Sequence, residues 1–454
     1  METLRDNYPH AGRMAVRPLH VVVVGAGITG LTAGLALRRT GHSVTILEQA
    51  PQISEVGAGL QMAPNATRIL SRLGVLESVV RKMTMITRAS LRRYDDEEVT
   101  ASPGMPMVGF KFGAPAGVIH RGDLQRILLD AAEASGCKII TGRAVQAVDP
   151  CFLPRILAVN KDNGSMEWYQ GDVIIAADGI KSSIRRQMAH QLGFSNELIP
   201  TGDAAYRLLI PREKVLNNNS LLELMDGSTG MRYMGPGGHI VGYPIKQNTL
   251  YNLVLIHPSK EKSGSQDEEI WERRGNRDEM LAYFKNWCPT IQAWLSLTDD
   301  EVVDWPLKTM KPLPTWVQGE VALAGDACHP MLPYIAQGAA NGIEDAAVLA
   351  TAFTCTDNIP EALALYQDVR KLRADTIAAS ASITGASLHL PDGEMQRKRD
   401  QMLRAQAAML KSGVKSDDKW SDAKSQEFMW STDVMMETIT AWEKIVGSRE
   451  VSRV

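Results

Sequence analysis

The 454-residue sequence predicts an α/β protein in which a helix-covered parallel sheet is interleaved with a second, mixed sheet and followed by a helical C-terminal region. Three observations support this fold class. Residues 19–49 read as strand, glycine turn, helix and strand, and the four consecutive valines are typical of a strand buried on both faces. Residues 202–258 alternate apolar and polar side chains between turns. Beyond residue 338 the spacing of apolar residues becomes mostly helical.

The composition narrows the class of protein. A formal net charge of −3, without a Lys/Arg block, argues against a large nucleic-acid surface. No apolar run reaches the roughly 18 residues that a membrane helix needs, and residues 1–18 lack the apolar core of a signal peptide, so we expect a flexible arm there. Five scattered cysteines form neither a CxxC pair nor a zinc spacing, so we expect reduced thiols, no metal site and a cytoplasmic protein.

The first glycine turn predicts a Rossmann-like nucleotide site. Gly25 allows the tight turn, Gly27 lets a pyrophosphate approach the backbone, and Gly30 permits close packing of the helix that follows. That helix also presents unpaired N–H groups to phosphates. Glu48 ends the second strand, where a carboxylate accepts hydrogen bonds from a ribose diol and repels a 2′-phosphate. The predicted ligand is an adenosine dinucleotide, either FAD or NAD.

Further glycine-rich segments bear on the choice between FAD and NAD. In residues 55–61 small side chains would let the backbone lie against a flat ring, although a simple turn explains them as well. Asp178 follows another buried strand, in what would by itself be an ordinary Asp-Gly turn. Residues 321–346 repeat the strand–turn–helix pattern, about 300 residues after the first turn. By themselves, the residues of this segment leave a functional role open.

Together these segments resemble the FAD-dependent aromatic hydroxylases. They are the single-component (class A) flavoprotein monooxygenases with the para-hydroxybenzoate hydroxylase fold, and the salicylate hydroxylase-like enzymes are the nearest group. The resemblance spans residues 19–433, and the motifs occur in the family's order. It implies the following organisation: a flexible arm at 1–18, the first part of an FAD-binding domain with a small antiparallel insertion at 19–200, a substrate-binding β-sheet domain at 201–310, the second part of the FAD-binding domain at 311–390, and a helical C-terminal region at 391–454.

The resemblance also implies roles for individual residues around FAD. Asp326 would accept hydrogen bonds from the ribityl hydroxyls, and the helix that begins near Gly338 would direct its N–H groups at the pyrimidine edge of the flavin. Arg121 would contact the diphosphate and ribityl region, with Gln125 one turn later on the same helix face. The complete set of expected cofactor residues is Gly25, Gly27, Gly30, Glu48, Ala58, Gly59, Gln61, Arg121, Gln125, Asp178, Asp326, Gly338 and Ala339.

Two residues are candidates for catalysis on the substrate side. In some fungal relatives a strand arginine and a tyrosine before proline lie near the substrate and flavin, and Arg207 and Tyr243 match them. A guanidinium stabilises a phenolate and a tyrosine holds or relays its proton, whereas the ordinary interpretation is an exposed strand arginine and a core tyrosine. Leu208 stands where relatives often have glycine. We expect His329 to shape its loop rather than to act as an acid or base.

The expected activity follows from the resemblance. It is hydroxylation or epoxidation of an electron-rich phenolic, polyketide or indole-like molecule, with NAD(P)H and O2, through a flavin C4a-hydroperoxide, in secondary metabolism. The sequence contains no second GxGxxG, so we expect NAD(P)H to meet the flavin only transiently. Alternatives are an FAD oxidoreductase that inserts no oxygen, a non-catalytic flavoprotein and a plain NAD dehydrogenase. The last leaves the Gly325-Asp326 turn without explanation.

Overall fold

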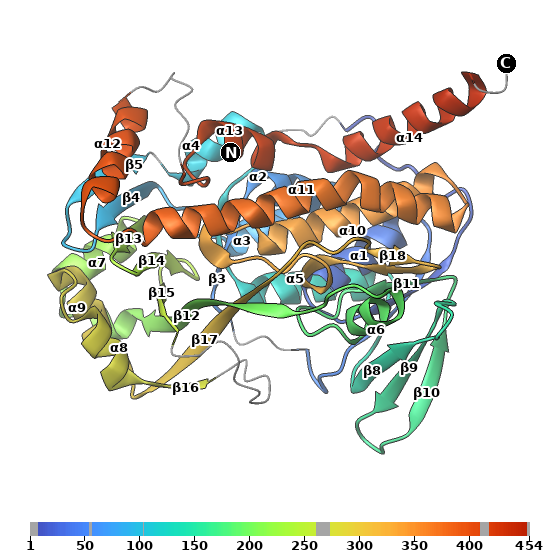
Figure 1. Ribbon diagram of the computed structural model, residues 1–454, viewed down its shortest axis with the longest axis horizontal. Helices are drawn as coiled ribbons and strands as arrows, with labels where there is room; N and C mark the ends of the chain where they lie inside the picture. Colours follow the sequence, from blue (N-terminus) through green and yellow to red (C-terminus); the bar gives the residue numbers. More distant parts are fainter. Residues whose placement is uncertain (1–7, 54–56, 103, 260–272, 409–416, 452–454) are drawn as a thin grey trace.

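The computed structural model describes residues 8–53, 57–102, 104–259, 273–408 and 417–451. Residues 1–7 of the expected arm and residues 55 and 56 of the glycine-rich loop lie outside this part of the chain. The molecule is elongated, with a parallel sheet towards one end and a larger mixed sheet at the other (Figure 1).

The parallel sheet combines strands from both halves of the sequence, as the two glycine turns predict. Its order is β18-β19-β11-β1-β2-β7, in which all neighbours are parallel except β18 and β19. The central strands β1 and β11 carry almost only buried side chains, which explains their unbroken valines and isoleucines. The strands are β1 (His20–Val24), β2 (Ser43–Leu47), β7 (Lys138–Ile140), β11 (Val173–Ala176), β18 (Val317–Gln318) and β19 (Val321–Leu323).

Helices pack around this sheet, and two smaller sheets accompany it. The three-stranded antiparallel sheet, β8 to β10, is the small insertion that the sequence predicts (Figure 1, lower right). The elements are α1 (Ile28–Arg39), α2 (Pro64–Arg72), α3 (Leu76–Lys82), α4 (Met105–Phe112), α5 (Arg121–Ala134), α6 (Ser183–Leu192), β3 (Gly59–Met62), β6 (Gly117–His120), β8 (Arg143–Val148), β9 (Arg155–Asn160) and β10 (Met166–Gln170).

The mixed sheet has eight strands, in the order β16-β17-β12-β15-β14-β13-β4-β5. The sheet extends beyond the predicted substrate domain at residues 201–310, because β4 pairs in parallel with β13, and β5 pairs with β4. The cause is that a strand edge pairs through its backbone, so a distant segment can complete it. The strands are β4 (Arg88–Arg93), β5 (Glu98–Ser102), β12 (Leu198–Pro211), β13 (Thr229–Gly235), β14 (Gly238–Ile245), β15 (Leu250–Pro258), β16 (Arg273–Asn276) and β17 (Glu301–Met310).

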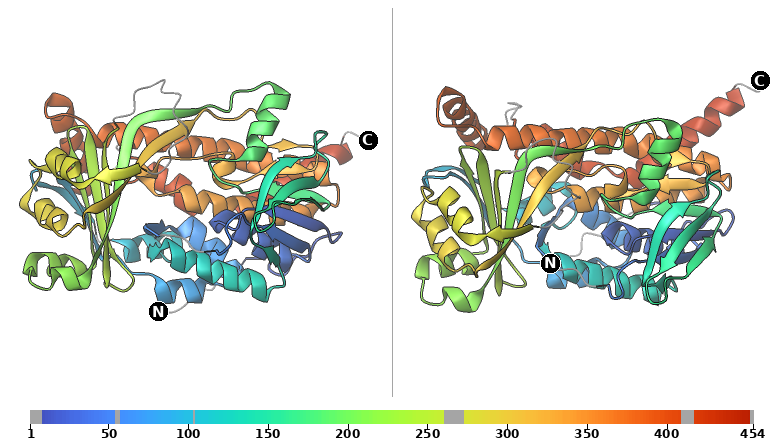
Figure 2. Two further views of the ribbon diagram at one scale, coloured as in Figure 1. Left: turned by 90° about the horizontal axis from the view of Figure 1, so that it is seen from below. Right: turned by 60° about the horizontal axis from the view of Figure 1, so that its bottom comes forward.

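The two faces of the mixed sheet have different neighbours. Tyr206, Leu208 and Leu253 point to one face and build a core with the outer helices α7 (Asn219–Asp226), α8 (Arg277–Phe284) and α9 (Pro289–Ser296). Since side chains alternate along a strand, Arg207 and Asn252 point to the opposite face. Figure 2 shows α8 and α9 in yellow at the end of the molecule remote from the blue N-terminal segment. The second face is therefore directed at the nucleotide-type domain.

The C-terminal third is helical, as predicted. The 30-residue helix α11 (Ile359–Leu388) runs along the molecule towards the mixed sheet (Figure 1). Within the described residues no helix is both long and apolar enough to cross a membrane. The other elements are the short 3-10 turns η1 (Arg212–Val215), η2 (Gly325–Ala327) and η3 (Pro333–Ile335), the helices α10 (Gly338–Cys355), α12 (Glu394–Ala408), α13 (Ala423–Gln426) and α14 (Val434–Val451), and the π-helical turn η4 (Glu427–Ser431).

Candidate active site

Four of the predicted residues follow the carboxyl ends of neighbouring parallel strands. Gly25 follows β1, Glu48 follows β2, Asp178 lies two residues after β11, and Gly325 lies two residues after β19. In an open parallel sheet these ends share one edge, where ligands bind in the crevice outside the strands. The fold therefore gathers the predicted turns at one edge.

The first turn has the geometry that the glycines predict. Gly25 has φ +95°, and a Cβ there would lie 2.5 Å from the carbonyl oxygen of Ala177. A Cβ at Gly30 would lie 1.9 Å from the carbonyl oxygen of Gly25, so the helix can approach the turn only with glycine. A Cβ at Gly27, in contrast, would have no described atom within 4 Å. Gly25 and Gly30 are thus required by the fold, and Gly27 borders open space.

Glu48 and Gln125 brace this turn from both sides. Ala26 N donates to Glu48 Oε2 at 2.8 Å, and Gln125 Nε2 donates to the Ala26 carbonyl at 3.0 Å. The other Glu48 oxygen accepts from Ala50 N at 2.8 Å. Each carboxylate oxygen keeps a second lone pair for a ribose hydroxyl. The structure therefore assigns Gln125 a contact with the turn itself, which the sequence did not predict.

The two distant glycine turns meet at Thr29. A Cβ at Gly325, which has φ +63°, would lie 2.5 Å from Thr29 Oγ1, and a Cβ at Gly342 would lie 2.1 Å from the same atom. The first turn of α1 thus packs directly against the second glycine turn and against α10. This contact brings the two motifs into one site.

Asp326 stands out in the second turn. Its neighbours from Val321 to Pro330 are buried, but Asp326 is exposed, and its carboxylate has no hydrogen-bond or ion-pair partner among the described residues. Arg185 holds the backbone of this turn, because its Nη1 donates to the Ala327 carbonyl at 3.0 Å. A fixed backbone with a free carboxylate suits a ligand rich in hydroxyl groups.

The helices α1 and α10 both begin without a capping side chain. Neither has an acidic residue in its first turn, whereas α6 and α11 are capped by Ser182 and Asn358. Gly338 and Ala339 form the first turn of α10 and are half-buried. Uncapped helix N-termini attract anionic groups through their N–H donors and the helix dipole.

Asp178 supplies another unused oxygen beside the first turn. Its Oδ2 accepts from Ser183 N at 3.0 Å, while Oδ1 is buried without a partner among the described residues. Burial raises the pKa of Asp178. The open space at Gly27, the uncapped helices, Asp326 and Asp178 together fit a dinucleotide with anionic phosphates and sugar hydroxyls.

The glycine-rich loop is held against the mixed sheet. Arg121 N donates to the Ala58 carbonyl at 3.1 Å, and Gly59 N donates to Asn252 Oδ1 at 2.8 Å. A Cβ at Gly59 would lie 2.5 Å from the Tyr243 ring, so only glycine fits there. Gln61 follows in β3, which pairs with β6 opposite Val118. The loop thus connects the nucleotide edge to the substrate candidates.

Arg207 and Tyr243 lie on the same face of the mixed sheet and influence each other. Arg207 pairs with Val254, and Tyr243 with Asn252, two residues along the same strand. The Nε of Arg207 is buried without a hydrogen-bond partner in the part of the chain that the structure describes, and its guanidinium lies 5.6 Å from the ring centre of Trp305.

Electrostatics at this pair favour an added negative charge. Burial, assisted by the charge of Arg121, lowers the pKa of Arg207, while Tyr243 opposes that shift. Burial raises the pKa of Tyr243 against the opposing effect of Arg207. Tyr243 therefore stays protonated at neutral pH, and Arg207 presents a positive charge that no described carboxylate neutralises.

His329 belongs to a buried network rather than to the open edge. Burial disfavours its charge, but the Asp345 carboxylate, 2.5 Å from His329 Nε2, raises the pKa of His329 well above its usual value. Asp345 also accepts from Gly325 N and from Arg370, both at 2.8 Å. Cys328 completes a trio with metal-ligand chemistry, yet the Asp345 oxygens are already engaged. The trio anchors the second turn.

Sequence reasoning missed three residues that organise the site. Thr29 joins the two turns, Asn252 holds the glycine-rich loop, and Trp305 lies beside Arg207. Thr29 lies inside the first glycine motif, so the sequence did offer a signal for its importance. Nothing in the sequence marks Asn252 or Trp305, because their roles depend on strand register.

Comparisons with known proteins agree with this geometry. A family model described as "FAD binding domain" matches residues 18–381. The FAD-dependent monooxygenase OpS4 of Beauveria bassiana is 37% identical over 393 residues, covering 85% of this chain and 89% of that protein. The 3-hydroxybenzoate 6-hydroxylase of Polaromonas naphthalenivorans is 31% identical over 391 residues, covering 84% and 91%. A salicylate hydroxylase structure, solved as a substrate complex, matches with a TM-score of 0.73 at 26% identity, covering 93% and 97%.

Proposed function

The chain belongs to the FAD binding domain family and is an FAD-dependent monooxygenase, and on that premise we propose that it hydroxylates or epoxidises an electron-rich aromatic small molecule with NAD(P)H and O2. We propose phenolic, polyketide or indole-like substrates, a role in secondary metabolism and a cytoplasmic location. The names of two of the relatives above, a 3-hydroxybenzoate 6-hydroxylase and a salicylate hydroxylase, support an aromatic substrate.

The observation that carries this proposal is the unneutralised charge of Arg207 beside Tyr243. Arg207 has a buried Nε without a partner, and no described carboxylate pairs with it. A phenolate oxygen between these side chains would receive a charge-assisted hydrogen bond from Arg207 and a second one from the protonated Tyr243. Ionising the phenol makes the ring more electron-rich, so these residues would favour attack on an electrophilic oxygen.

The cofactor role belongs to the edge that the two turns share. The α1 N-terminus would hold the pyrophosphate beside Gly27, Glu48 the adenosine ribose, and Asp326 the ribityl hydroxyls. The α10 N-terminus would face the flavin ring through Gly338 and Ala339. When bound, the flavin supplies the acceptance of a hydride from NAD(P)H and the activation of O2.

An apolar cluster on the Arg207 face of the mixed sheet would keep water away from the reacting atoms. Ala205, Ile256 and Leu332 are almost fully buried there, and Val254 and Met331 pack against them while remaining partly accessible. Partly accessible apolar side chains inside a cluster suit a flat aromatic ligand. A dry site protects the activated oxygen from release into water.

The test is an activity measurement on the purified, FAD-loaded protein. Oxidation of NADH and NADPH is followed in the presence of phenols, naphthols and indoles as substrates. The masses of the products are measured by mass spectrometry. We expect substrate-stimulated oxidation of the reduced nicotinamide and a product heavier by one oxygen atom. Stimulated turnover without a gain of oxygen would instead favour an FAD oxidoreductase, and bound FAD without stimulated turnover a non-catalytic flavoprotein.

A further inference from the structure

The C-terminal segment 417–433 is held by arginines of α2, α11 and the mixed sheet. Arg68, on the helix that directly follows the loop, donates to the Trp430 carbonyl at 3.2 Å. Arg373 of α11 donates to the Met429 carbonyl at 2.8 Å, and Arg232 of the mixed sheet pairs with Asp418 at 3.2 Å. The segment is therefore tied to both halves of the site.

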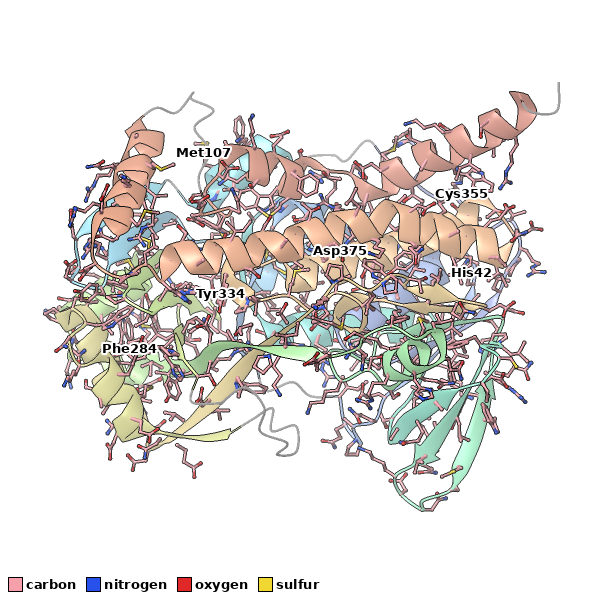
Figure 3. The ribbon with its side chains drawn as sticks, viewed as in Figure 1. His42, Met107, Phe284, Tyr334, Cys355 and Asp375 are labelled. Carbon is pink, nitrogen blue, oxygen red and sulfur yellow. The ribbon has the colours of Figure 1, made fainter. Side chains whose placement is uncertain are left out.

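A small enclosed cavity of about 30 Å³ lies beneath this segment. Its walls come from the glycine-rich loop and its continuation, from α4 and from segment 417–433. Figure 3 labels Met107 on α4, close to the C-terminal helices in that view. The lining includes Gln61, Ala63, Met105, Val108, Trp420 and Trp430.

Both tryptophans of this cavity carry an unused donor. The Nε1 atoms of Trp420 and Trp430 are buried and have no hydrogen-bond partner among the described residues. Trp430 is only 1% exposed, and it packs edge-on against Phe112 at 5.4 Å and against Trp420 at 6.2 Å. Burying an indole N–H without an acceptor is unfavourable, so two such donors at one cavity indicate an acceptor that binds there. Trp430 also lies in a π-helical turn, a feature found frequently at functional sites.

The lining of the cavity shares residues with the apolar cluster of the proposed substrate site. Trp430 and Ala63 belong to the same apolar cluster as Ala205 and Ile256 of the mixed sheet, and Val254 packs against this cluster. Val254 is also the strand partner of Arg207. Figure 3 shows Tyr334, another member of the cluster, near the end of α11 closest to the sheet. The two tryptophans therefore contact the apolar cluster that Arg207 adjoins through its strand partner Val254.

We propose that Trp420 and Trp430 form a second substrate-binding subsite, which takes a carbonyl oxygen carried on a ring beyond the one that is oxidised. The subsite rests on the proposed function, and it narrows the substrate class to fused or linked aromatic molecules with such an acceptor. A volume of about 30 Å³ admits an oxygen-bearing group but not a ring, so the rings themselves lie in the apolar cluster.

The test compares two ligands on matched variants of the full-length, FAD-loaded protein. The ligands are 3-hydroxyxanthone and its carbonyl-free counterpart, 3-hydroxyxanthene, and their dissociation constants are read from perturbation of the flavin absorption. The variants are Trp430→Phe and Trp420→Phe, which keep an aromatic ring but lose the donor. Trp168→Phe, at a residue that is 50% exposed on β10, is the control.

We expect each of the first two variants to bind 3-hydroxyxanthone about 5- to 10-fold more weakly, the loss that one hydrogen bond produces. The two variants should bind 3-hydroxyxanthene as tightly as the wild type does. The Trp168→Phe control should bind both ligands with wild-type affinity. Equal affinity for both ligands in the wild-type protein, absence of binding by either, or equal affinity across the variants would overturn the subsite and leave an ordered water as the cavity's occupant. Trp420 is partly exposed, so Trp420→Phe provides the test if Trp430→Phe fails to fold.

Flavin content and melting temperature, measured on every variant, separate the two proposals. A wild-type protein that takes up no FAD contradicts the proposed function. A protein that holds FAD and oxidises phenols, but whose tryptophan variants behave like the control, contradicts the subsite alone.

Discussion

Two regions of the molecule bury arginine side chains in opposite ways. Between α10 and α11, Arg370 donates to Asp345 at 2.8 Å and also contacts Glu344, and Arg373 donates to Glu344 at 2.7 Å. On the mixed sheet, the buried Nε of Arg207 has no partner among the residues that the structure describes. A buried charge that the fold fully pairs maintains the architecture, whereas one that the fold leaves unpaired is available to a ligand. This contrast separates structural from functional charges although all lie near the site.

Breaking the paired network should have the largest effect on stability. Arg370→Met leaves Glu344 and Asp345 with less compensation in the interior, so we expect a loss of about 3–5 kcal/mol in the free energy of unfolding. Chemical denaturation measures it. The control, Arg81→Met, removes an exposed pair with Glu77 and should cost below about 1 kcal/mol. Similar losses in both variants would remove the distinction between the two regions.

Removing the unpaired charge should leave the fold intact and affect activity instead. We expect Arg207→Met to melt at or above the wild-type temperature, because the substitution removes a buried charge that has no partner among the described residues and so costs folding energy. Turnover of a phenol should fall about 100- to 1,000-fold, the range measured for removal of one charge-stabilising donor. Steady-state kinetics with the best substrate checks this, and Arg207→Lys should recover part of the rate. Unchanged kinetics in Arg207→Met would show that the unpaired arginine serves no ligand.

An exposed, unpaired carboxylate tests the same distinction at the nucleotide edge. Asp326→Ala removes the proposed acceptor for the ribityl hydroxyls, so FAD should bind about 10-fold more weakly, while the stability of the apoprotein stays unchanged. Fluorescence titration with FAD gives the affinity. Asp130→Ala, at a side chain that is 64% exposed on α5, is the matched control. If Asp326→Ala and Asp130→Ala weaken FAD binding by the same factor, the effect comes from the general loss of negative charge.

The smallest expected effect concerns the pH dependence of the paired network. Asp345 raises the folded-state pKa of His329 well above the ordinary value of 6.5, so the charged pair contributes stability fully below about pH 6.5 and loses it as pH rises through the folded pKa. The same pairing lowers the pKa of Asp345, which keeps its charge at pH 5. The difference in melting temperature between the wild type and His329→Gln should therefore be largest near pH 5–6 and narrow at alkaline pH. A melting-temperature difference that widens as pH rises would contradict a charged His329–Asp345 pair.

The sequence determined much of this protein because local chemistry sets local structure. The glycines at 25, 27 and 30, the buried valines and the order of the turns predicted the parallel sheet and the site of the cofactor. The local backbone decides these features: the positive φ of Gly25 favours glycine, and a Cβ at Gly30 would lie only 1.9 Å from the carbonyl oxygen of Gly25.

Only the tertiary structure decided which distant residues meet. The pairing of β4 with β13, the contact of Thr29 with Gly325, and the hold of Asn252 on Gly59 join segments separated by more than 100 residues. So does the position of Trp430, which lines one cavity with Gln61 and Ala63. Strand register and helix packing produce these contacts through backbone hydrogen bonds and buried apolar area, and neither leaves a mark on single residues. The sequence therefore predicted the turns that would hold the cofactor, and the fold defined the surface beside them where a substrate would bind.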